Sequence, residues 1–560
     1  MKKLSFLFAV TALVSLSAFA QKNFNRERTF DALNYTMRVS FDRDSKTVFG
    51  DSTIRFKPLA DNFRVLQLDT EDTKFSRVTL VGSGVELPYK LEGKTIAITL
   101  DRNYSAGEEI EVRMVYRSKP KKGIYFVDAV KQKGKTLLNR QVWTQGEAEE
   151  AHHWLPSFDF PDDKATTELF ITVEKGETAI GNGELIEKTE NSDSTVTFHY
   201  KMPLPYSLYL TSFVVGTYTK VEEKYGDIPL GYYVYPGQES LVPKAYGKTK
   251  EMMKVFEEVT GVKYPYNKYD QTIVANFSFG GMENITATTM ADNEIFMARS
   301  TFGASLVEDL VSHELAHSWF GDLVTCRNWA ELWLNESFAT FMEAVFREKA
   351  YGKSQFEAKI QTDALEYFTY ESTPGARQHP VFNTIADPND DDSIFDPITY
   401  QKGSAVLYTL RKEIGDEAFW RALNIYLNRH KFQNVETKDL KAAFEETSNR
   451  DLTWFFDQWI YSEGYPQVRV DPIFATKSKL LTLKFRQTQK NDSDTPAAFR
   501  LPIKVKVLVG RKYVTKDIVL TERMQTETFK IDQKPQTLEV DPEKNLPLMV
   551  VSLKPIAVRP

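Results

Sequence analysis

The chain has 560 residues, of which 42% are hydrophobic and 26% are charged. A chain of this length exceeds what one hydrophobic core supports, so we expect a globular protein of several domains. The formal net charge of −6 argues against binding to nucleic acid or to an anionic membrane surface. The single cysteine, Cys326, excludes an intrachain disulfide.

The first 20 residues have the pattern of a secretory signal peptide. Lys2 and Lys3 precede a small and apolar run over residues 4–18, and Ala-Phe-Ala at residues 18–20 fits a cleavage site. The run is shorter than a membrane-spanning helix requires. We therefore predict that residues 1–20 are removed and that the protein is exported without spanning the membrane. Because no intrachain disulfide can form, a bacterial periplasmic or extracellular location is favoured.

Three regions follow, and they differ in the period of their apolar residues. Residues 21–236 are predicted to form a β domain, because runs such as YTMRVSFD and EIEVRMVY alternate apolar and polar residues between turns. After Tyr-Pro-Gly at residues 235–237 the period becomes helical, which predicts a mostly helical domain over residues 237–463. Beyond Ser-Glu-Gly-Tyr-Pro at residues 462–466, runs such as LLTLKF and IKVKVLVG predict a β domain over residues 464–560.

The helical region contains a His-Glu-x-x-His pattern at His313, Glu314 and His317. Residues four apart lie on one face of a helix, so both imidazoles can bind one ion while Glu314 reaches a water on it. We expect the helix to begin near a capping box formed by Ser305 and Glu308 and to stop near Gly321. The alternative is a pair of core histidines with no metal.

A third ligand is available in a second helical pattern, WAELWLNESFATFMEAVF, which contains Glu336. Catalytic zinc takes three protein ligands and keeps one position open. An antiparallel helix pair would return Glu336 to the two histidines. A Glu in a helix is usually a solvated charge, but here Trp333, Leu334 and Phe338 surround it in the sequence, and such a setting requires a partner.

The segment HELAHSWFGDLVTCRNWAELWLNESFATF closely resembles the zinc-binding segment of the gluzincin aminopeptidases, a family that includes alanyl and puromycin-sensitive aminopeptidases and the leukotriene-hydrolase branch. The resemblance implies that His313, His317 and Glu336 hold one Zn²⁺ per chain and that Glu314 is the general base. It also implies a multidomain α+β fold. The expected parts are a saddle-like N-terminal β domain, a thermolysin-like and mostly helical catalytic domain, and a C-terminal β-sandwich.

The sequence GGMEN at residues 280–284 is similar to the exopeptidase motif of the same family. By itself it would be interpreted as a glycine-rich hairpin turn. The resemblance implies that Glu283 binds the α-amine of the substrate, while the backbone of Gly280 and Gly281 approaches the peptide closely. Met282 is expected to line the pocket for the first side chain. Gly281 stands where the family usually has Ala.

A second amine-binding carboxylate is expected from TQGEAEEAHHWLPSFDFPDD, which resembles another segment of the family. The resemblance assigns this role to Glu147 and places Gln145 beside it in the site. Glu149 and Glu150 are close alternatives for the same role. A charged amine is recognised best by carboxylates held at a fixed distance from the metal.

Two adjacent histidines, His152 and His153, lie in the same segment. They offer nitrogen ligands for a second metal ion. Histidines on the surface of a helix, or packed against its neighbours, explain the pair better than a second metal site does. We therefore expect no second metal site here.

The segment FDPITYQKGSAVLYTL is similar to the Tyr-x-Lys-Gly segment of the family. The resemblance implies that Tyr400 donates a hydrogen bond to the negative oxygen that forms when water attacks the peptide carbonyl. Tyrosine is common in this chain, with 26 copies, so an isolated Tyr would be assigned to the core.

Together these motifs predict a zinc metallo-aminopeptidase that removes N-terminal residues from peptides with a free amine. The alternatives are a thermolysin-like endopeptidase, which would also cleave N-acetylated peptides, and a non-catalytic scaffold of the same fold. Many relatives continue with a large helical domain, whereas this chain ends at Pro560. We therefore expect a more open site and a weaker preference for tripeptides. The patterns predict neither the oligomeric state nor the preferred N-terminal side chain.

Overall fold

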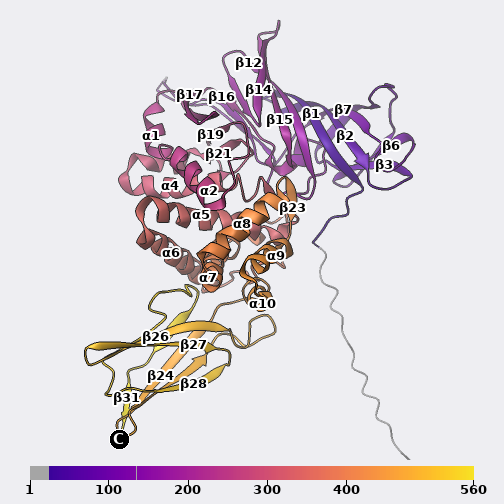
Figure 1. Ribbon diagram of the computed structural model, residues 1–560. Coiled ribbons are helices and arrows are strands. Elements are labelled where there is room, and N and C mark those ends of the chain that lie inside the picture. Colours follow the sequence, from indigo (N-terminus) through magenta and orange to yellow (C-terminus); the bar gives the residue numbers. More distant parts are fainter. Residues whose placement is uncertain (1–23, 134) are drawn as a thin grey trace, which may run out of the picture.

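The computed structural model describes residues 24–133 and 135–560, which form three consecutive parts (Figure 1). The predicted signal peptide at residues 1–20 lies outside the described residues. A β-rich part is followed by a mostly helical part, and a second β-rich part ends the chain. Within the described residues, no helix is long and apolar enough to cross a membrane.

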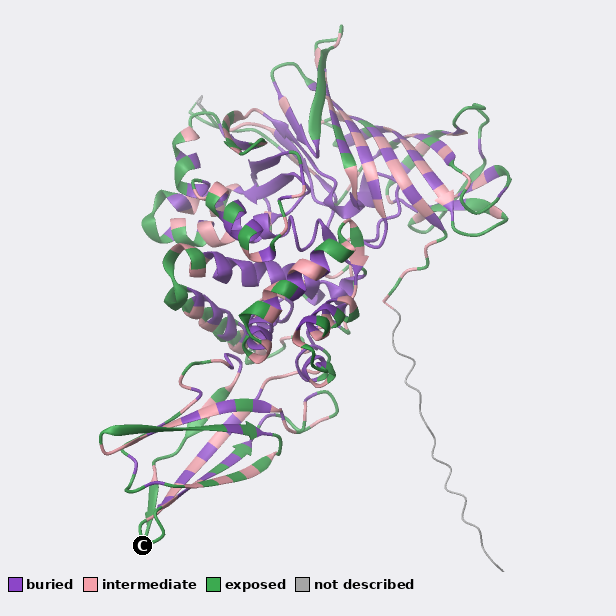
Figure 2. Ribbon diagram, in the orientation of Figure 1, coloured by how far each residue is buried: buried purple, intermediate pink, exposed green. Residues whose placement is uncertain are grey.

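The first β-rich part is built on a seven-stranded sheet in which β1 (Phe30–Asp42) lies at the centre. It pairs in parallel with β12 (Lys164–Glu174) and antiparallel with β2 (Thr47–Pro58). Burial alternates along these strands, as the sequence pattern predicts (Figure 2). The sheet continues through β14 (Glu184–Glu190) and β15 (Thr195–Ser207) on one side, and β7 (Ile110–Ser118) and β4 (Thr73–Leu80) on the other. A separate three-stranded sheet contains β3 (Phe63–Asp69), β6 (Thr95–Tyr104) and β5 (Tyr89–Glu92).

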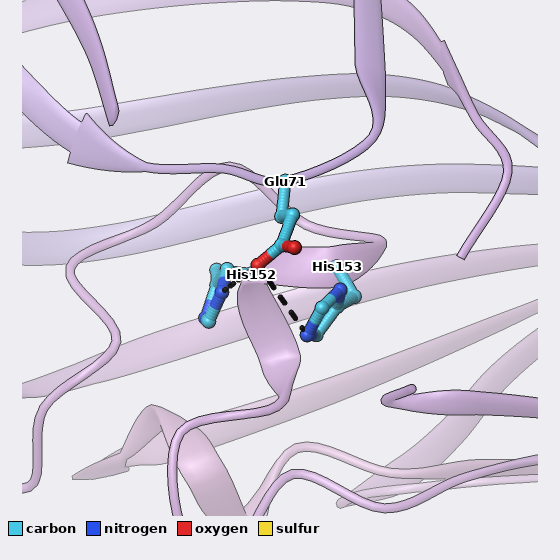
Figure 3. Close-up of side chains that lie close together, drawn as sticks. All are labelled: Glu71, His152 and His153. Carbon is cyan, nitrogen blue, oxygen red and sulfur yellow. Dashed lines mark ion pairs between the residues drawn. The ribbon is translucent and has the colours of Figure 1, made fainter. Parts of the chain in front are cut away.

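A four-stranded sheet leads from this part toward the helical part. Its strands run in the order β13 (Thr178–Gly181), β16 (Phe213–Gly216), β11 (Gln141–Thr144) and β8 (Ile124–Val127). The chain leaves β11 and forms a short 3-10 helix, η1 (Ala151–His153), whose two histidines face Glu71 (Figure 3). Both histidines are buried, so the interpretation as surface residues of a helix is wrong.

The helical part contains its own five-stranded sheet, in the order β17 (Thr219–Tyr225), β18 (Ile228–Val234), β19 (Tyr269–Val274), β21 (Ala287–Ala291) and β20 (Gly281–Met282). Strand β18 pairs in parallel with β19, although the two lie on opposite sides of the boundary predicted after residue 236. That boundary therefore divides one continuous sheet, whose first strand in the sequence is β17. Turn residues at 235–237 marked the end of a strand and not the end of a domain.

Several of the motifs described above lie on the helices of this part. They are α2 (Thr249–Thr260), α4 (Thr301–Ala316), α5 (Trp333–Tyr351), α6 (Lys353–Glu371), α7 (Gly403–Ile414), α8 (Asp416–His430), α9 (Thr437–Ser448) and α10 (Thr453–Trp459). Helix α4 begins one turn earlier than the sequence suggested, because Ser300 accepts a hydrogen bond from the Gly303 backbone N–H and caps it. The predicted capping box at Ser305 and Glu308 is therefore wrong.

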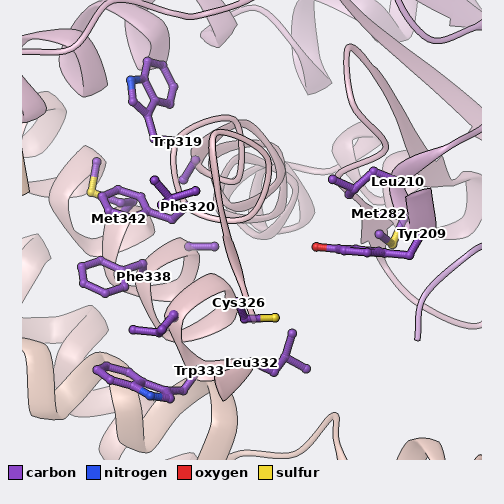
Figure 4. Packing of buried hydrophobic residues seen from close by; sticks show 14 of the residues in the cluster. Tyr209, Leu210, Met282, Trp319, Phe320, Cys326, Leu332, Trp333, Phe338 and Met342 are labelled. Carbon is purple, nitrogen blue, oxygen red and sulfur yellow. The ribbon is translucent and has the colours of Figure 1, made fainter. Parts of the chain in front are cut away.

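Apolar packing fixes α4 against α5. The rings of Phe320 and Phe338 stack with centroids 4.5 Å apart, and Trp333 lies beside Phe338 (Figure 4). Asn335 on α5 accepts a hydrogen bond from the Cys326 backbone N–H at 3.0 Å. Burial of several aromatic rings, each with a large apolar area, holds α5 against the segment that follows α4.

The last part contains two β-sheets. The larger has the order β28 (Met524–Lys530), β25 (Leu480–Gln487), β24 (Gln467–Ala475) and β30 (Val550–Leu553), with β31 (Ala557–Arg559) also paired to β24. The smaller has the order β27 (Lys512–Leu520), β26 (Leu501–Val509) and β29 (Thr537–Val540). The side chain of Gln458 on α10 bonds to both the N–H and the C=O of Arg500, which ties this part to the helices.

Candidate metal and catalytic site

Three predicted metal ligands converge between α4 and α5. His313 lies in the last turn of α4, His317 caps its end, and Glu336 lies in the first turn of α5. Oε2 of Glu336 is 3.2 Å from Nε2 of His313 and 3.3 Å from Nε2 of His317. The three ligand atoms all lie within 4.8 Å of one another. Two imidazoles and one carboxylate at this spacing match the donor set of a zinc site with an open position.

The distal nitrogen of each imidazole has its own partner. Nδ1 of His313 is 2.9 Å from Oε1 of Glu343, and Nδ1 of His317 is 2.9 Å from the backbone oxygen of Phe320. Donating Nδ1–H to these oxygens leaves both Nε2 lone pairs directed at the common point. This arrangement is typical of histidines that bind a metal, and the residues present therefore fit a zinc ion.

Glu343 is the residue that the sequence did not identify. It lies seven positions after Glu336, about two helical turns along the same face, and this spacing could have identified it. Lys359 on α6 lies 2.9 Å from Oε2 of Glu343 and also contacts Asp363. Although burial raises the pKa of Glu343, the charges of Lys359 and His313 outweigh this effect and lower it. Glu343 is therefore an ionised acceptor for His313.

Glu336 is likewise held in its ionised form. Burial opposes ionisation, but the neighbouring imidazoles of His317 and His313 lower the pKa of Glu336 to about 2. A carboxylate ligand must be ionised to bind a cation. The protonated imidazoles thus keep Glu336 ionised, and a bound cation would take the place of their Nε2 protons.

Glu314 is buried one residue away from the first ligand, on the wall of the same pocket. Its Oε2 atom has no hydrogen-bond partner among the described residues. Burial raises the pKa of Glu314 to about 8. A Cβ atom at position 281 would come within 2.1 Å of its Oε1, so the glycine there leaves the carboxylate free to occupy this place.

Two further carboxylates enter the pocket from different sheets. Glu283 follows β20, Glu147 follows β11, and the two lie with Glu336 in a group whose ligand oxygens are all within 4.8 Å. Gln145 lies between them, with Nε2 3.2 Å from the sulfur of Met282. Within the part of the chain that the structure describes, Oε1 of Glu147, Glu283 and Gln145 has no hydrogen-bond partner.

The alternatives to Glu147 lie elsewhere. Glu149 accepts a hydrogen bond from the indole N–H of Trp329, and Glu150 accepts from the backbone N–H of Gly123 and the hydroxyl of Tyr125. Neither lines the pocket. Of the three glutamates in this segment, only Glu147 lies beside the metal ligands.

Tyr400 closes the other side of the pocket. Its ring lies 5.9 Å from that of His313, at an interplanar angle of 13°. A single π-helical turn, η7 (Ile398–Lys402), carries Tyr400 and is held by Ser337, which donates to the backbone oxygen of Thr399 at 2.6 Å. The surrounding burial raises the pKa of Tyr400 well above its ordinary value, so the phenol keeps its proton. It is thus a hydrogen-bond donor at neutral pH.

These residues surround a cavity of about 350 Å³. Its remaining walls are largely apolar and include Phe279, Leu306, Leu310, Phe395 and Met282. Gly280 and Gly281 form one edge of it. Such a cavity suits a small ligand with a polar group that meets the unsatisfied acceptors and a side chain that packs on the apolar side.

Comparison with known families gives two matches along the chain. Residues 31–210 match the peptidase M1 N-terminal domain, and residues 244–459 match the peptidase family M1 domain. The second match contains the metal ligands, Glu314, Glu283 and Tyr400. The first contains Gln145 and Glu147, so residues of both matched regions line the same pocket.

Several curated proteins are similar to this chain. Aminopeptidase N of Streptomyces lividans is 36% identical over 343 residues, which cover 59% of this chain and 39% of the relative. Aminopeptidase 2 of Candida albicans is 27% identical over 81% of this chain and 50% of the relative. Glutamyl aminopeptidase of Bos taurus is 33% identical over 64% of this chain and 38% of the relative. The chain thus spans half or less of the length of these relatives.

Proposed function

Because the chain belongs to peptidase family M1, we propose that it is a zinc-dependent aminopeptidase. It removes N-terminal residues from peptides with a free α-amine, as the names of its relatives suggest. We further propose that one Zn²⁺ per chain is held by His313, His317 and Glu336. The M1 family match and the converging ligand atoms support this assignment.

One observation carries the exopeptidase assignment. Oε1 atoms of Glu147, Glu283 and Gln145 are buried, face one pocket beside the metal ligands and have no partner among the described residues. Burying unsatisfied acceptors costs roughly 1–3 kcal/mol each, so a folded protein retains them where a ligand satisfies them. An α-ammonium offers three N–H donors and the charge that two carboxylates require. The peptide bond next to that ammonium then lies at the metal.

The other residues supply the groups that hydrolysis needs. When bound, Zn²⁺ lowers the pKa of a coordinated water and polarises the peptide carbonyl. Glu314 accepts a proton from the attacking water and delivers it to the leaving amine. Tyr400 donates its phenolic hydrogen to the oxygen on which negative charge develops. Glu343 holds the His313 ring in the tautomer that the metal site requires.

The two alternatives are less consistent with this arrangement. An endopeptidase binds uncharged chain on both sides of the cleaved bond, which would leave Glu147 and Glu283 buried without a counter-charge. A non-catalytic scaffold has no need to retain Glu314 and Tyr400 beside a complete ligand set. We therefore favour the aminopeptidase.

A panel of aminoacyl-anilides, each with a matched N-acetyl derivative, tests this proposal. We expect release from at least one free-amine substrate, loss of release with a chelator, and recovery on addition of Zn²⁺. The acetylated partner should be cleaved at least ~100-fold more slowly, because it lacks the charged donor. Chelator-insensitive release, or equal rates for the acetylated partner, would reject it.

Three domain types and the location of the protein also belong to this proposal. We assign the N-terminal β domain to the saddle-like type and the helical part to the thermolysin-like type, and we interpret the two C-terminal sheets as a β-sandwich. The alternation of buried residues on β24 and β26 supports the last assignment. The predicted signal peptide supports export to a bacterial periplasm or medium. Fractionation of cells that express the full chain tests this location.

A further inference from the structure

A second cluster of metal-ligand side chains lies in the N-terminal β domain, apart from the catalytic pocket. Glu71 follows β3, and His152 and His153 lie on η1, so residues about 80 positions apart in the sequence meet here. Their ligand atoms lie within 4.8 Å of one another, and both rings face the carboxylate of Glu71 (Figure 3). Glu71, His152 and His153 do not line the catalytic cavity.

The distances suit a single small cation. Oε2 of Glu71 lies 3.7 Å from Nε2 of His152 and 4.0 Å from Nε2 of His153. In a tetrahedral zinc site with bonds of about 2.0–2.1 Å, two ligand atoms lie roughly 3.3 Å apart. The two imidazole rings are stacked, with centroids 4.6 Å apart and an interplanar angle of 24°, so binding one ion requires at least one ring to rotate as the carboxylate moves closer. The backbone already joins the two segments, because the N–H of Glu71 donates to the oxygen of His152 at 3.2 Å.

His152 is oriented as a ligand. Its Nδ1 lies 2.8 Å from Oδ2 of Asp159, which also accepts the His152 backbone N–H at 2.9 Å. A carboxylate on Nδ1 fixes the tautomer and directs the Nε2 lone pair away from it, here toward Glu71. His152 is only 8% exposed, and its Nε2 has no hydrogen-bond partner in the described part of the chain. Burial of such an atom requires a partner that the protein side chains do not supply.

One existing contact competes with a cation. The ammonium of Lys94 lies 2.9 Å from Oε2 of Glu71. The side chain of Lys94 is 58% exposed, and the amide oxygen of Asn389 lies 3.5 Å from the same ammonium. Lys94 can therefore turn away at small cost when a divalent ion takes its place, since exposed ion pairs contribute little to stability. The side chain of Glu71 is 27% exposed, which provides the entry path.

We propose that Glu71, His152 and His153 form a second divalent-cation site of the Zn²⁺ type, with Asp159 orienting His152. Two imidazoles and one carboxylate are the donor set for zinc and its late first-row neighbours, and a water completes the coordination. The site fastens η1 to the end of β3. Because Glu147 lies five positions before His152, the ion stabilises the segment that carries the amine-binding carboxylate.

The site is tested by counting bound Zn²⁺ in the full-length protein by equilibrium dialysis and elemental analysis. We expect two ions per chain in the wild type and one in the His313→Ala, His317→Ala double variant. Adding Glu71→Gln to that double variant should remove the remaining ion or weaken it at least ~10-fold. In the double variant, Zn²⁺ should raise Tm, and Glu71→Gln should abolish this rise.

Two further variants keep the test decisive if Glu71→Gln folds poorly. Lys94→Met removes the competing ammonium at an exposed position and should tighten binding of the second ion several-fold. Glu149→Gln changes a carboxylate of the same segment that bonds to Trp329 and should leave the count at two. One ion in the wild type and none in the His313→Ala, His317→Ala variant would overturn the second site. One ion retained in that variant and lost or weakened on adding Glu71→Gln would support it whether or not the protein is an aminopeptidase, because the carboxylates that remain in the catalytic pocket do not include Glu71.

Discussion

Nδ1 of His313 lies 2.9 Å from Oε1 of Glu343, so a predicted ligand at the end of α4 is oriented by a carboxylate on α5, two turns beyond Glu336. Outer carboxylates of this kind fix the tautomer and the ring plane of a metal-binding imidazole. Lys359 and His313 keep Glu343 ionised, so the contact is charge-assisted. The metal affinity of the catalytic site should therefore depend on a residue that does not touch the metal.

Glu343→Gln should weaken Zn²⁺ binding at the catalytic site about 10- to 100-fold. The amide keeps the size of the side chain but loses the charge that favours the required tautomer of His313. Competition with a chelator of known affinity measures the change. Glu348→Gln is a matched control on the same helix, because Glu348 pairs with Arg411 and does not line the pocket. Equal zinc affinity in the two variants would show that Glu343 does not orient the ligand.

Glu314→Gln should lower kcat by about 10²- to 10⁴-fold, because general acid–base catalysis typically contributes this much. The isosteric amide cannot accept the proton, yet His313, His317 and Glu336 remain. The zinc content per chain should therefore be unchanged. An inactive variant that has also lost zinc would mean that Glu314 supports the site structurally and does not act as the base.

Glu283→Gln and Glu147→Gln should each lower kcat/KM for free-amine substrates by about 10- to 100-fold. A hydrogen bond to a charged group contributes roughly 1.5–3 kcal/mol. Part of the loss should appear as a higher KM. Substrates without the amine should lose much less. Glu149→Gln is the control from the same segment, since Glu149 bonds to Trp329 outside the pocket. Loss of the same size with Glu149→Gln would argue against a specific amine contact.

Tyr400→Phe should lower kcat about 10²- to 10³-fold with KM little changed, because one donor to a developing oxyanion contributes this much and acts only in the transition state. The ring that stacks near His313 is preserved in the variant. Single-turnover measurements separate the chemical step from product release. An unchanged chemical rate would refute the role of the phenol.

Glu331 gives the stability of the protein a defined pH dependence. It is buried, Thr437 donates to its Oε2 through N–H and hydroxyl, and burial raises the pKa of Glu331 to about 7. The folded state therefore binds more protons than the unfolded state between about pH 4.5 and 7. Its contribution to stability is complete below pH 4.5 and is lost as the pH rises through 7.

Glu331→Gln removes this titration and retains an acceptor for Thr437. The Tm of the wild type minus that of the variant should fall as the pH rises from 4.5 to 7.5. The difference between a pKa of 4.5 in the unfolded state and about 7 in the folded state corresponds to a change of about 3 kcal/mol at most in the free energy of unfolding. Scanning calorimetry at several pH values measures it. A constant difference in Tm over this range would contradict the raised pKa.

Local geometry predicted part of the metal site, and the family resemblance implied the roles of the catalytic residues. A spacing of four places His313 and His317 on one helical face whatever the rest of the fold does. Apolar neighbours in the sequence indicated that Glu336 would be buried, and the alternating strands predicted β structure at both ends of the chain. These inferences need only the period of a helix or a strand.

Sequence also misplaced some features, for reasons that are physical. The cap of α4 is Ser300 and not Ser305, because several serines offer the same side chain and packing selects among them. The boundary after residue 236 failed because β18 pairs in parallel with β19, and such a partner lies beyond a crossover that no local signal reports.

By itself, therefore, the sequence predicted that His313 and His317 share one ion, since they are four positions apart, and the family resemblance implied the role of Glu314 as the base. Only the tertiary structure decided which glutamate of Glu147, Glu149 and Glu150 enters the pocket, that Glu343 supports His313, and that Glu71 meets His152 and His153. Those contacts join segments tens of residues apart. They depend on how sheets and helices pack, and side-chain packing is fixed by the whole core and not by the spacing along the chain.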